Sequence, residues 1–568
     1  MEEFLKRCRV YFAYAFFFSL FINLLMLTLP IFMLQVFDRV ISSRSQETLV
    51  VLTVAAVFGL SLHAVLSLIR ERLLAGAGIA LDGMAGLPVL RGVLKMEVKP
   101  GVNEYTPGLR DIATIRSFLS GNGITSLFDA PWMPIFLGVI FMFHPLLGII
   151  ATTGGLLLFA MAYLNEKMTR GPIEETGSAM RRASYYIDAG TRNAEVVNAL
   201  GMIGNLSGRW NKLNNTVIDA KITSDIRGKS MQGLTKYFRM ILQILMLATG
   251  AWLVIQQQVS SGVMIAGTLI LSRALAPIDS AITTWKGFID ARVSYKRLKE
   301  LLQQSPVEEA GMELPAPTGK LEVDRIIYSI PKQDRAIIKG ISFSLEAGES
   351  LGLIGPSAAG KSTLARLLIG IWRPISGTVR LDDADISTWP REHLGKYIGY
   401  LPQDVELFAG TVAENISRLA INADSEEIID AARRANAHEL ILRLPKAYDT
   451  EIGVSGTVLS AGQRQRIALA RAIYGKPSFV VLDEPNANLD TEGENALSQT
   501  LQQLSRDGVT VVTISHRPSL LNHVDKLLVL KDGQIEAFGP RAEVMQKFTP
   551  QVQNAGGISP VRSANQNT

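Results

Sequence analysis

The first half of the chain contains apolar runs that are long enough to cross a lipid bilayer. They occupy residues 11–37, 49–69, 128–164, 238–256 and 263–282, and the third run is long enough for two spans, with a break at 143–145. A membrane-crossing helix needs about 20 apolar residues. Buried helices of a soluble protein would be shorter and would carry a polar stripe. The sequence therefore predicts an all-α transmembrane domain with six spans.

Basic side chains gather in two of the loops between these runs. Arg70, Arg72, Arg91 and Lys95 follow the second run, and a longer basic series lies between residues 167 and 229, after the fourth span. Loops rich in Lys and Arg remain in the cytoplasm. We therefore expect a multi-pass protein, surrounded by membrane lipids, with both termini cytoplasmic. This bias also explains the net charge of +5, so no nucleic-acid partner is expected.

The length of 568 residues is too great for a single domain. We predict a transmembrane domain over residues 1–300, a linker rich in Pro, Gly and Glu over 301–319, a second domain over 320–550 and a disordered tail over 551–568. The single cysteine, Cys8, excludes an internal disulfide and a cysteine-bound metal cluster.

A few residues inside the apolar runs depart from the apolar pattern. Pro30 and Pro277 predict bends in the first and last spans, because proline removes a helical hydrogen bond. His63, Arg273 and Asp279 are polar groups that we expect to face a cavity or a partner helix.

The second half contains a glycine-rich loop of the form G-x-x-x-x-G-K-[ST]. An apolar strand pattern at 350–354 precedes the loop, and a helical pattern at 364–369 follows it. This order aims backbone N–H groups and a helix N-terminus at one point, which suits phosphate binding. Lys361 is placed to reach the β and γ phosphates, and Ser362 to hold Mg²⁺. The predicted nucleotide-binding residues are Gly355, Pro356, Ser357, Ala358, Ala359, Gly360, Lys361, Ser362 and Thr363.

Four further polar residues complete the predicted hydrolytic site. Asp483 and Glu484 end a buried strand pattern, where Asp483 would support Mg²⁺ and Glu484 would orient or deprotonate the attacking water. His516 ends a second strand pattern and would contact the γ-phosphate. Gln403 follows a third, where its amide would bind both Mg²⁺ and the water.

A second helix N-terminus suited to phosphate follows the segment Leu459, Ser460, Ala461, Gly462 and Gln463. One ATP cannot easily use both N-termini of the same subunit. The segment LSAGQRQR resembles the signature of ATP-binding-cassette proteins, and the motif order from about residue 321 to 539 matches that family. The resemblance implies an α/β P-loop nucleotide-binding domain that hydrolyses ATP with Mg²⁺. It also implies a homodimer in which each signature acts on the partner's ATP, with Asp490 in the D-loop.

Members of that family usually stack the adenine on an aromatic ring, and the matching position here falls near Ile330. Tyr328 lies two residues away, on the same face of a strand. It is therefore the candidate for adenine stacking, and the alternative is a tyrosine packed within the strand.

A narrower resemblance involves residues 29–49, FDAPWMPIF at 128–136, FHPLLG at 143–148 and EPNANLD at 484–490. These segments resemble type I secretion ATPases of the protease and lipase exporter branch. The resemblance implies a bacterial inner-membrane pump joined to a periplasmic membrane-fusion adaptor and an outer-membrane channel. Its cargo would be an unfolded, secreted polypeptide with a C-terminal signal. Because the chain begins almost at its first span, a cysteine-peptidase-like amino-terminal domain is expected to be absent.

One six-span domain followed by one cassette makes half of a dimeric exporter, and in this layout we expect the tips of the cytoplasmic loops, around residues 111–116 and 198–209, to dock near Gln403. An exporter of lipids or small amphipathic molecules is the first alternative. A non-transporting cassette ATPase is the second, and the six spans disfavour it.

Overall fold

The computed structural model describes residues 2–97, 108–304, 314–331, 335–453 and 458–553. The chain divides near residue 307 into a helical unit and a second unit that contains the sheets. The helical unit extends into the predicted linker, because its last helix continues to Gln304. Residues 314–319 of that linker have no regular structure, and residues 305–313 lie outside the described part. The predicted tail begins inside a helix that ends at Gln553, and its residues 554–568 are also not described.

The helical unit has six helical segments that are long and apolar enough to cross a membrane: Cys8–Ser43, Gln46–Met96, Gly123–Phe143, Pro145–Arg192, Ile203–Ile255 and Ser261–Gln304. The predicted six spans are therefore confirmed. The α-helices of the unit are α1 (Glu2–Leu25), α2 (Thr28–Gln35), α3 (Ile41–Ser43), α4 (Gln46–Glu97), α5 (Gly108–Leu119), α6 (Asn122–Asp129), α7 (Met133–Phe143), α8 (Pro145–Arg192), α9 (Ala194–Ala199), α10 (Ile203–Ile255) and α11 (Ser261–Gln304). A π-helix, η1 (Val36–Val40), and a 3₁₀-helix, η2 (Ala130–Trp132), complete it.

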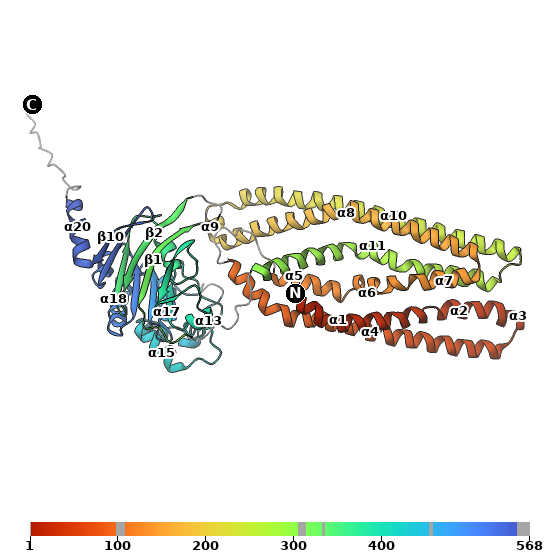
Figure 1. Ribbon diagram of the computed structural model, residues 1–568, viewed down its shortest axis with the longest axis horizontal. Helices are drawn as coiled ribbons and strands as arrows, with labels where there is room; N and C mark the ends of the chain where they lie inside the picture. The colour runs from red at the N-terminus through yellow and green to blue at the C-terminus, as the bar shows by residue number, and fades with distance from the viewer. Residues whose placement is uncertain (1, 98–107, 305–313, 332–334, 454–457, 554–568) are drawn as a thin grey trace, which may run out of the picture. The chain divides into compact units, whose positions relative to one another are not determined.

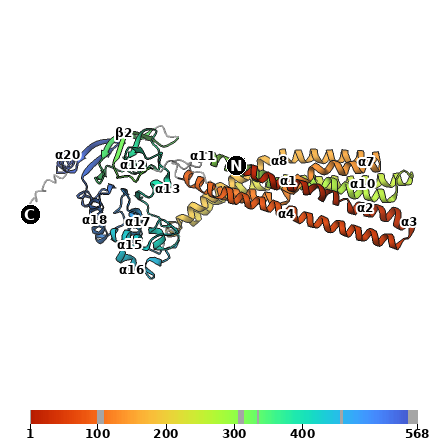
Figure 2. The same ribbon diagram turned by 60° about the horizontal axis from the view of Figure 1, so that its bottom comes forward.

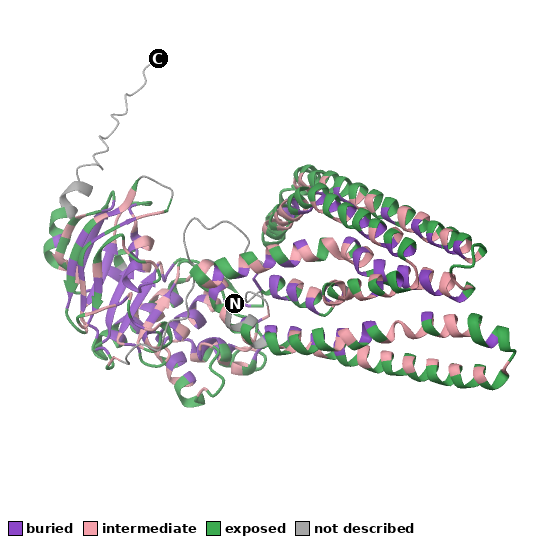
Figure 3. Ribbon diagram, turned by 45° about the vertical axis from the view of Figure 1, so that its right-hand side comes forward, coloured by how far each residue is buried: buried purple, intermediate pink, exposed green. Residues whose placement is uncertain are grey.

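The long helices of this unit pack in pairs, with α1 along α4 and α8 along α10 (Figures 1 and 2). A core around Phe136, Ile140 and Leu271 joins α7, α8, α10 and α11. Exposed residues recur along the outside of these helices (Figure 3). They include many large apolar side chains, among them Val51, Val54 and Phe58 of α4. Exposed apolar surface on this scale suits lipid rather than water.

The two prolines in the first and last spans occupy different environments. The first span breaks at residues 26–27, and Pro30 stands near the start of α2, where its missing N–H matters least. Pro277 lies buried inside α11.

Four side chains form a polar cluster between α1, α4 and α6, which we call the Arg70 cluster: Ser19, Asn23, Arg70 and Asp129. The Arg70 guanidinium donates to Asp129 at 2.6 Å and to the Ser19 hydroxyl at 2.9 Å. Asn23 donates to the same Asp129 oxygen at 3.0 Å. The cluster ties the first three spans together.

Asp38 links two distant parts of the helical unit. One of its carboxylate oxygens accepts from the Ser260 hydroxyl at 2.5 Å, and the other accepts from the Gly262 N–H at 3.0 Å. The Asp38 carboxylate, at the end of the first span, therefore accepts a hydrogen bond from a backbone N–H at the start of α11 that has no partner within its own helix.

The polar residues predicted to face a cavity or helix have separate environments. Asp279 pairs with Arg239 of α10. Arg273 is exposed in α11. The Nε2 atom of His63 is buried and makes no hydrogen bond to the described residues.

One of the two segments predicted to be a loop tip is part of a helix in the structure. Residues 111–116 lie within α5, where Asp111 is buried and pairs with Ser294 and Arg297 of α11, so they form a packed helix and no tip. Residues 198–209 include the turn between α9 and α10, and residues 98–107 lie outside the described part.

The second unit contains two sheets. The four-stranded antiparallel sheet has the order β2-β1-β4-β5, and the six-stranded sheet has the order β10-β9-β3-β8-β7-β6. The strands are β1 (Leu321–Ser329), β2 (Ala336–Leu345), β3 (Ser350–Ile354), β4 (Ser376–Leu381), β5 (Ala384–Asp385), β6 (Ile398–Leu401), β7 (Phe479–Asp483), β8 (Thr510–Ile514), β9 (Lys526–Lys531) and β10 (Gln534–Pro540). All neighbours in the larger sheet are parallel except β9 and β10.

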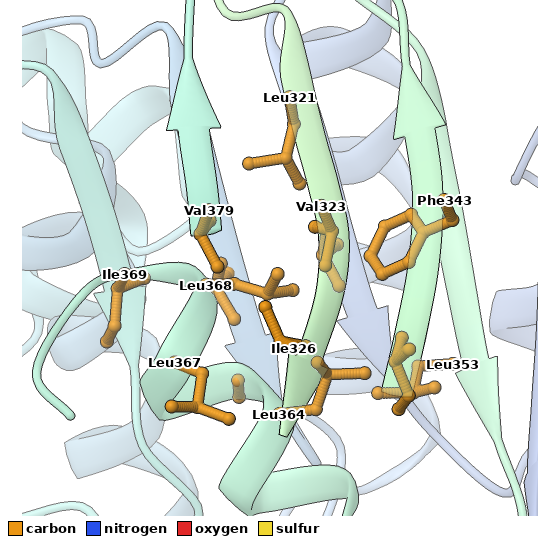
Figure 4. Close-up of a cluster of buried hydrophobic side chains, with 14 of the residues drawn as sticks. Leu321, Val323, Ile326, Phe343, Leu353, Leu364, Leu367, Leu368, Ile369 and Val379 are labelled. Atoms are coloured by element: carbon orange, nitrogen blue, oxygen red, sulfur yellow. The ribbon is translucent and has the colours of Figure 1, made fainter. Parts of the chain in front are cut away.

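Helices surround both sheets. They are α12 (Lys361–Leu368), α13 (Arg391–Leu394), α14 (Val412–Ile416), α15 (Ser425–Arg434), α16 (His438–Leu442), α17 (Ala461–Ile473), α18 (Thr491–Arg506), α19 (Pro518–Leu521) and α20 (Arg541–Gln553), with a 3₁₀-helix η3 (Ala447–Asp449). Leucines of α12 pack with β1 residues such as Ile326 in one buried cluster (Figure 4). A second cluster joins α14, α15, α17 and α18 to β7.

The parallel strands bring the predicted site residues to one edge of the larger sheet. Strands β6, β7, β8 and β3 are neighbours in register, with Leu401 beside Leu482 and Asp483 beside Ile514. The loops that carry Gln403, Glu484 and His516 leave the carboxyl ends of these strands, next to the loop after β3.

Candidate nucleotide-binding site

The loop between β3 and α12 has the backbone that phosphate binding requires. Gly355 and Gly360 have φ angles of +155° and +101°, which favour glycine. A Cβ on Gly355 would lie 2.1 Å from the carbonyl oxygen of Leu530. A side chain is therefore excluded at this position by both the backbone angle and the neighbouring strand.

Lys361 begins α12 and folds back over this loop. Its Nζ atom donates to the carbonyl oxygens of Gly355 at 2.8 Å and Pro356 at 3.0 Å. Burial lowers the pKa of the ammonium group, and the carboxylates of Glu484 and Asp483 act in the opposite direction. The lysine ammonium group is thus held within the loop between β3 and α12.

Asp483 is the last residue of β7 and is only 1% exposed. Within the described residues, neither of its carboxylate oxygens makes a hydrogen bond of ordinary geometry. Burial raises the pKa of this carboxyl, while the Ser362 hydroxyl beside it lowers the pKa. A buried carboxylate next to a hydroxyl supplies the hard oxygen ligands that Mg²⁺ prefers, so these two residues fit a bound Mg²⁺ ion.

Glu484 lies between the two other predicted catalytic side chains. Gln403 donates through Nε2 to one Glu484 carboxylate oxygen at 3.1 Å, and the Nε2 of His516 lies 3.9 Å from the other. The structure therefore brings Gln403, Glu484 and His516 together. The backbone of Glu484 has a φ of +50°, a left-handed conformation that is strained for a residue with a side chain.

The signature residues form the start of α17. Ser460 caps the helix, because its hydroxyl accepts from the Gln463 N–H at 3.3 Å and its own N–H donates to the Gln463 side chain at 2.9 Å. Leu459 is buried, while Ala461 and Gly462 form the first turn. Asp490 caps α18 by accepting from the Gly493 N–H at 2.8 Å.

Tyr328 packs within its strand in this structure, which is the alternative to adenine stacking, and adenine stacking stays a prediction. Its side chain is 4% exposed, and its ring stacks on Trp372 with centroids 5.2 Å apart and an interplanar angle of 11°. The register of β1 shifts between Val323 and Ile326, and the face that carries Ile326 and Tyr328 packs into the core. Residue spacing along the strand could not identify which face is buried.

Two polar residues next to the site, Gln465 and Ser515, were not identified by the sequence motifs. Gln465 of α17 is 2% exposed, and its amide contacts the backbone of the turn that follows Glu484. Ser515 donates to the Asn486 side chain at 3.2 Å and accepts from the Arg517 N–H. For Gln465, the one feature of the sequence that could have indicated these contacts is a polar amide among the apolar residues on one face of α17.

Comparisons with known proteins agree with the fold and show the family. The family described as ABC transporter matches residues 338–487, and the ABC transporter transmembrane region matches residues 12–277. The structure of a bacterial Atm1-family ABC exporter with ATP bound has a TM-score of 0.80 and 22% identity, covering 98% of this chain and 99% of that chain. This likeness confirms the predicted fold class.

Two curated relatives identify the family further. The type I secretion system ATP-binding protein PrsD of Rhizobium meliloti (strain 1021) is 45% identical over 550 residues, which cover 96% of this chain and 94% of that protein. The toxin RTX-I translocation ATP-binding protein of Actinobacillus pleuropneumoniae is 28% identical, over 93% of this chain and 75% of that protein. The chain therefore belongs to the ABC transporter family, among the type I secretion ATP-binding proteins, and is a multi-pass membrane protein whose ATP hydrolysis is coupled to transport.

Proposed function

We propose that this protein exports unfolded polypeptides of the protease or lipase type, which carry a C-terminal signal, across the bacterial inner membrane. The observation that carries this proposal is the 45% identity to a type I secretion protein along almost the whole length of both chains. The 28% identity to a toxin translocation protein supports polypeptide cargo as well.

ATP hydrolysis follows from the positions of the site residues. The Lys361 ammonium exchanges its two loop carbonyls for the β and γ phosphates of ATP. Asp483 and Ser362 would hold Mg²⁺, and the ion would neutralise phosphate charge there. Glu484 would accept a proton from the attacking water or orient it. Gln403 donates to one oxygen of the Glu484 carboxylate, and His516 lies 3.9 Å from the other.

Two copies of the chain complete the site. The Ser460–Gly462 turn presents a capped helix N-terminus, which suits the γ-phosphate of ATP bound to the partner. This arrangement makes each subunit contribute Lys361 and Glu484 to one site and Ser460 to the other. Asp490, at the start of α18, would lie near the interface between the copies.

The remaining assembly is proposed from the family and the charge pattern. Both termini lie in the cytoplasm, because the basic loops follow the second and fourth spans. A periplasmic membrane-fusion adaptor and an outer-membrane channel would continue the path. The alternative cargo, lipids or small amphipathic molecules, is an outcome of the test below.

The test is ATPase activity of the full chain reconstituted in lipid vesicles. We expect activity to change on addition of a polypeptide with a C-terminal secretion signal, and not on addition of the same polypeptide without that signal. Amphipathic drugs and extra lipid serve as comparison substrates. Rapid lipid transfer between leaflets, with no response to the signal polypeptide, would support lipid export instead.

A further inference from the structure

Gln465 connects the signature helix to the turn that carries Glu484. Its side-chain NH₂ group donates to the carbonyl oxygens of Glu484 at 3.4 Å and Pro485 at 2.5 Å. Its side-chain oxygen accepts from the Asn488 N–H at 3.2 Å. One amide therefore makes three contacts to the backbone of a five-residue turn, residues 484–488.

The environment of Gln465 makes these contacts hard to replace. The side chain is 2% exposed, so an amide that lost its partners would have no access to water. A Cβ on Gly462, one turn earlier in α17, would lie 3.1 Å from the Asn488 carbonyl oxygen. The first turns of α17 and the turn at 484–488 are therefore packed directly against each other.

The turn needs such support because its first residue is strained. Glu484 has a φ of +50°, and a left-handed residue other than glycine persists only where surrounding contacts hold it. On the other side, the Glu484 N–H donates to the Ile514 carbonyl at 3.0 Å. Gln465 acts on the carbonyl of the same residue, so the two contacts fix both ends of its peptide backbone.

We propose that Gln465 is a positioning residue that sets the orientation of the Glu484 carboxylate, and that it links this base to the signature helix of the same subunit. The proposal rests on the role of Glu484 as the catalytic base. In the two-copy arrangement the signature contacts the partner's ATP, so a shift of α17 on closing over that ATP moves the Glu484 backbone at the other site. Ser460 and Glu484 of one chain are thereby coupled through a single buried amide.

The first measurement is steady-state ATP hydrolysis by the full-length Gln465→Met variant. Methionine keeps the length of the side chain and removes the amide. We expect kcat to fall about tenfold to a hundredfold with KM for ATP changed about twofold or less, because only the geometry of the base is lost. Thr500→Val is the matched control, since it removes a hydroxyl that is 1% exposed and bonded to the Ala496 carbonyl, and its kcat should stay near that of the unchanged protein.

A double-mutant cycle separates positioning from general damage to the domain. In a Glu484→Gln background, Gln465→Met should cause no further loss of residual activity, because the group that it orients no longer acts as a base. The same fold-loss in both backgrounds, or an unchanged kcat for Gln465→Met alone, would overturn the proposal. Near-normal turnover by Glu484→Gln alone would instead refute the base itself.

Gln465→Glu gives an independent comparison if the methionine variant does not fold. The carboxylate keeps an acceptor for the Asn488 N–H but loses the donor to the Glu484 and Pro485 carbonyls. We expect its kcat to fall as in Gln465→Met, with ATP binding retained. Normal turnover by Gln465→Glu would show that the NH₂ contacts do not position the base.

Discussion

Replacing Asp129 by alanine should destabilise the helical unit strongly. The Arg70 side chain is 8% exposed and the Asp129 side chain 17% exposed, and their closest atoms are 2.6 Å apart. The Arg70 Nε atom already has no hydrogen-bond partner within the described residues. Among the residues that the structure describes, Asp129→Ala would leave the guanidinium with the Ser19 hydroxyl alone. Leaving one member of a buried pair without its partner costs about 3–5 kcal/mol of unfolding free energy.

A matched exposed pair supplies the control. Asp82 and Arg116 join α4 to α5 with side chains that are 36% and 48% exposed, so their ion pair contributes about 0–1 kcal/mol. Asp82→Ala should therefore change stability little. Asp129→Asn keeps an oxygen acceptor and loses the charge, so its loss of unfolding free energy should lie between those of Asp129→Ala and Asp82→Ala.

The single cysteine provides the assay. Cys8 is fully buried in α1, so a thiol-reactive fluorescent dye would label it only as the helical unit opens on heating in detergent. At about 2–4 °C per kcal/mol, Asp129→Ala should lower the apparent Tm by roughly 6–20 °C at a fixed heating rate. Equal shifts for Asp129→Ala and Asp82→Ala would refute the reasoning that the Arg70 cluster is a buried, paired network.

Three further predictions concern the cassette. Lys361→Ala should weaken ATP binding itself, measured with a fluorescent nucleotide, and unchanged affinity with slower turnover would contradict its placement on the phosphates. Ser460→Arg should abolish hydrolysis by the dimer while an isolated cassette still binds ATP, and normal turnover would argue against a signature that acts on the partner. Because burial raises the pKa of Asp483 and Mg²⁺ needs the ionised carboxylate, Mg²⁺–ATP binding should release more protons as the pH falls from about 7 towards 5. Calorimetry in buffers of different ionisation enthalpy would measure this release, which Asp483→Asn should remove.

Local sequence patterns predicted the parts of the fold that depend on local chemistry. The apolar runs became the six membrane-length helices, and the glycine pattern became the loop before α12, because hydrophobic length and backbone freedom are properties of consecutive residues. The grouping of Gln403, Glu484 and His516 was also predictable, since the ends of neighbouring parallel strands share one edge.

Contacts between distant residues could not be predicted in the same way. Arg70 and Asp129 stand 59 positions apart, and nothing in either apolar run indicates that they pair. Whether the Tyr328 ring is open to an adenine or packed could not be decided from spacing, because spacing gives two faces of a strand without saying which one is covered; in the structure the ring packs on Trp372. The sequence motif places Gln465 in the signature helix, but its side chain bonds to the backbone of the turn at residues 484–488.

The contact of Asp38 with the start of α11 has a mechanical consequence. A Cβ on Gly262 would lie 2.5 Å from an Asp38 oxygen and 2.7 Å from the Leu34 carbonyl, so the first span and α11 touch there without room for any side chain. At this end the first span and α11 are therefore braced against each other. A side chain at position 262 would push the two helices apart, so replacing Gly262 by any residue with a side chain should loosen this contact.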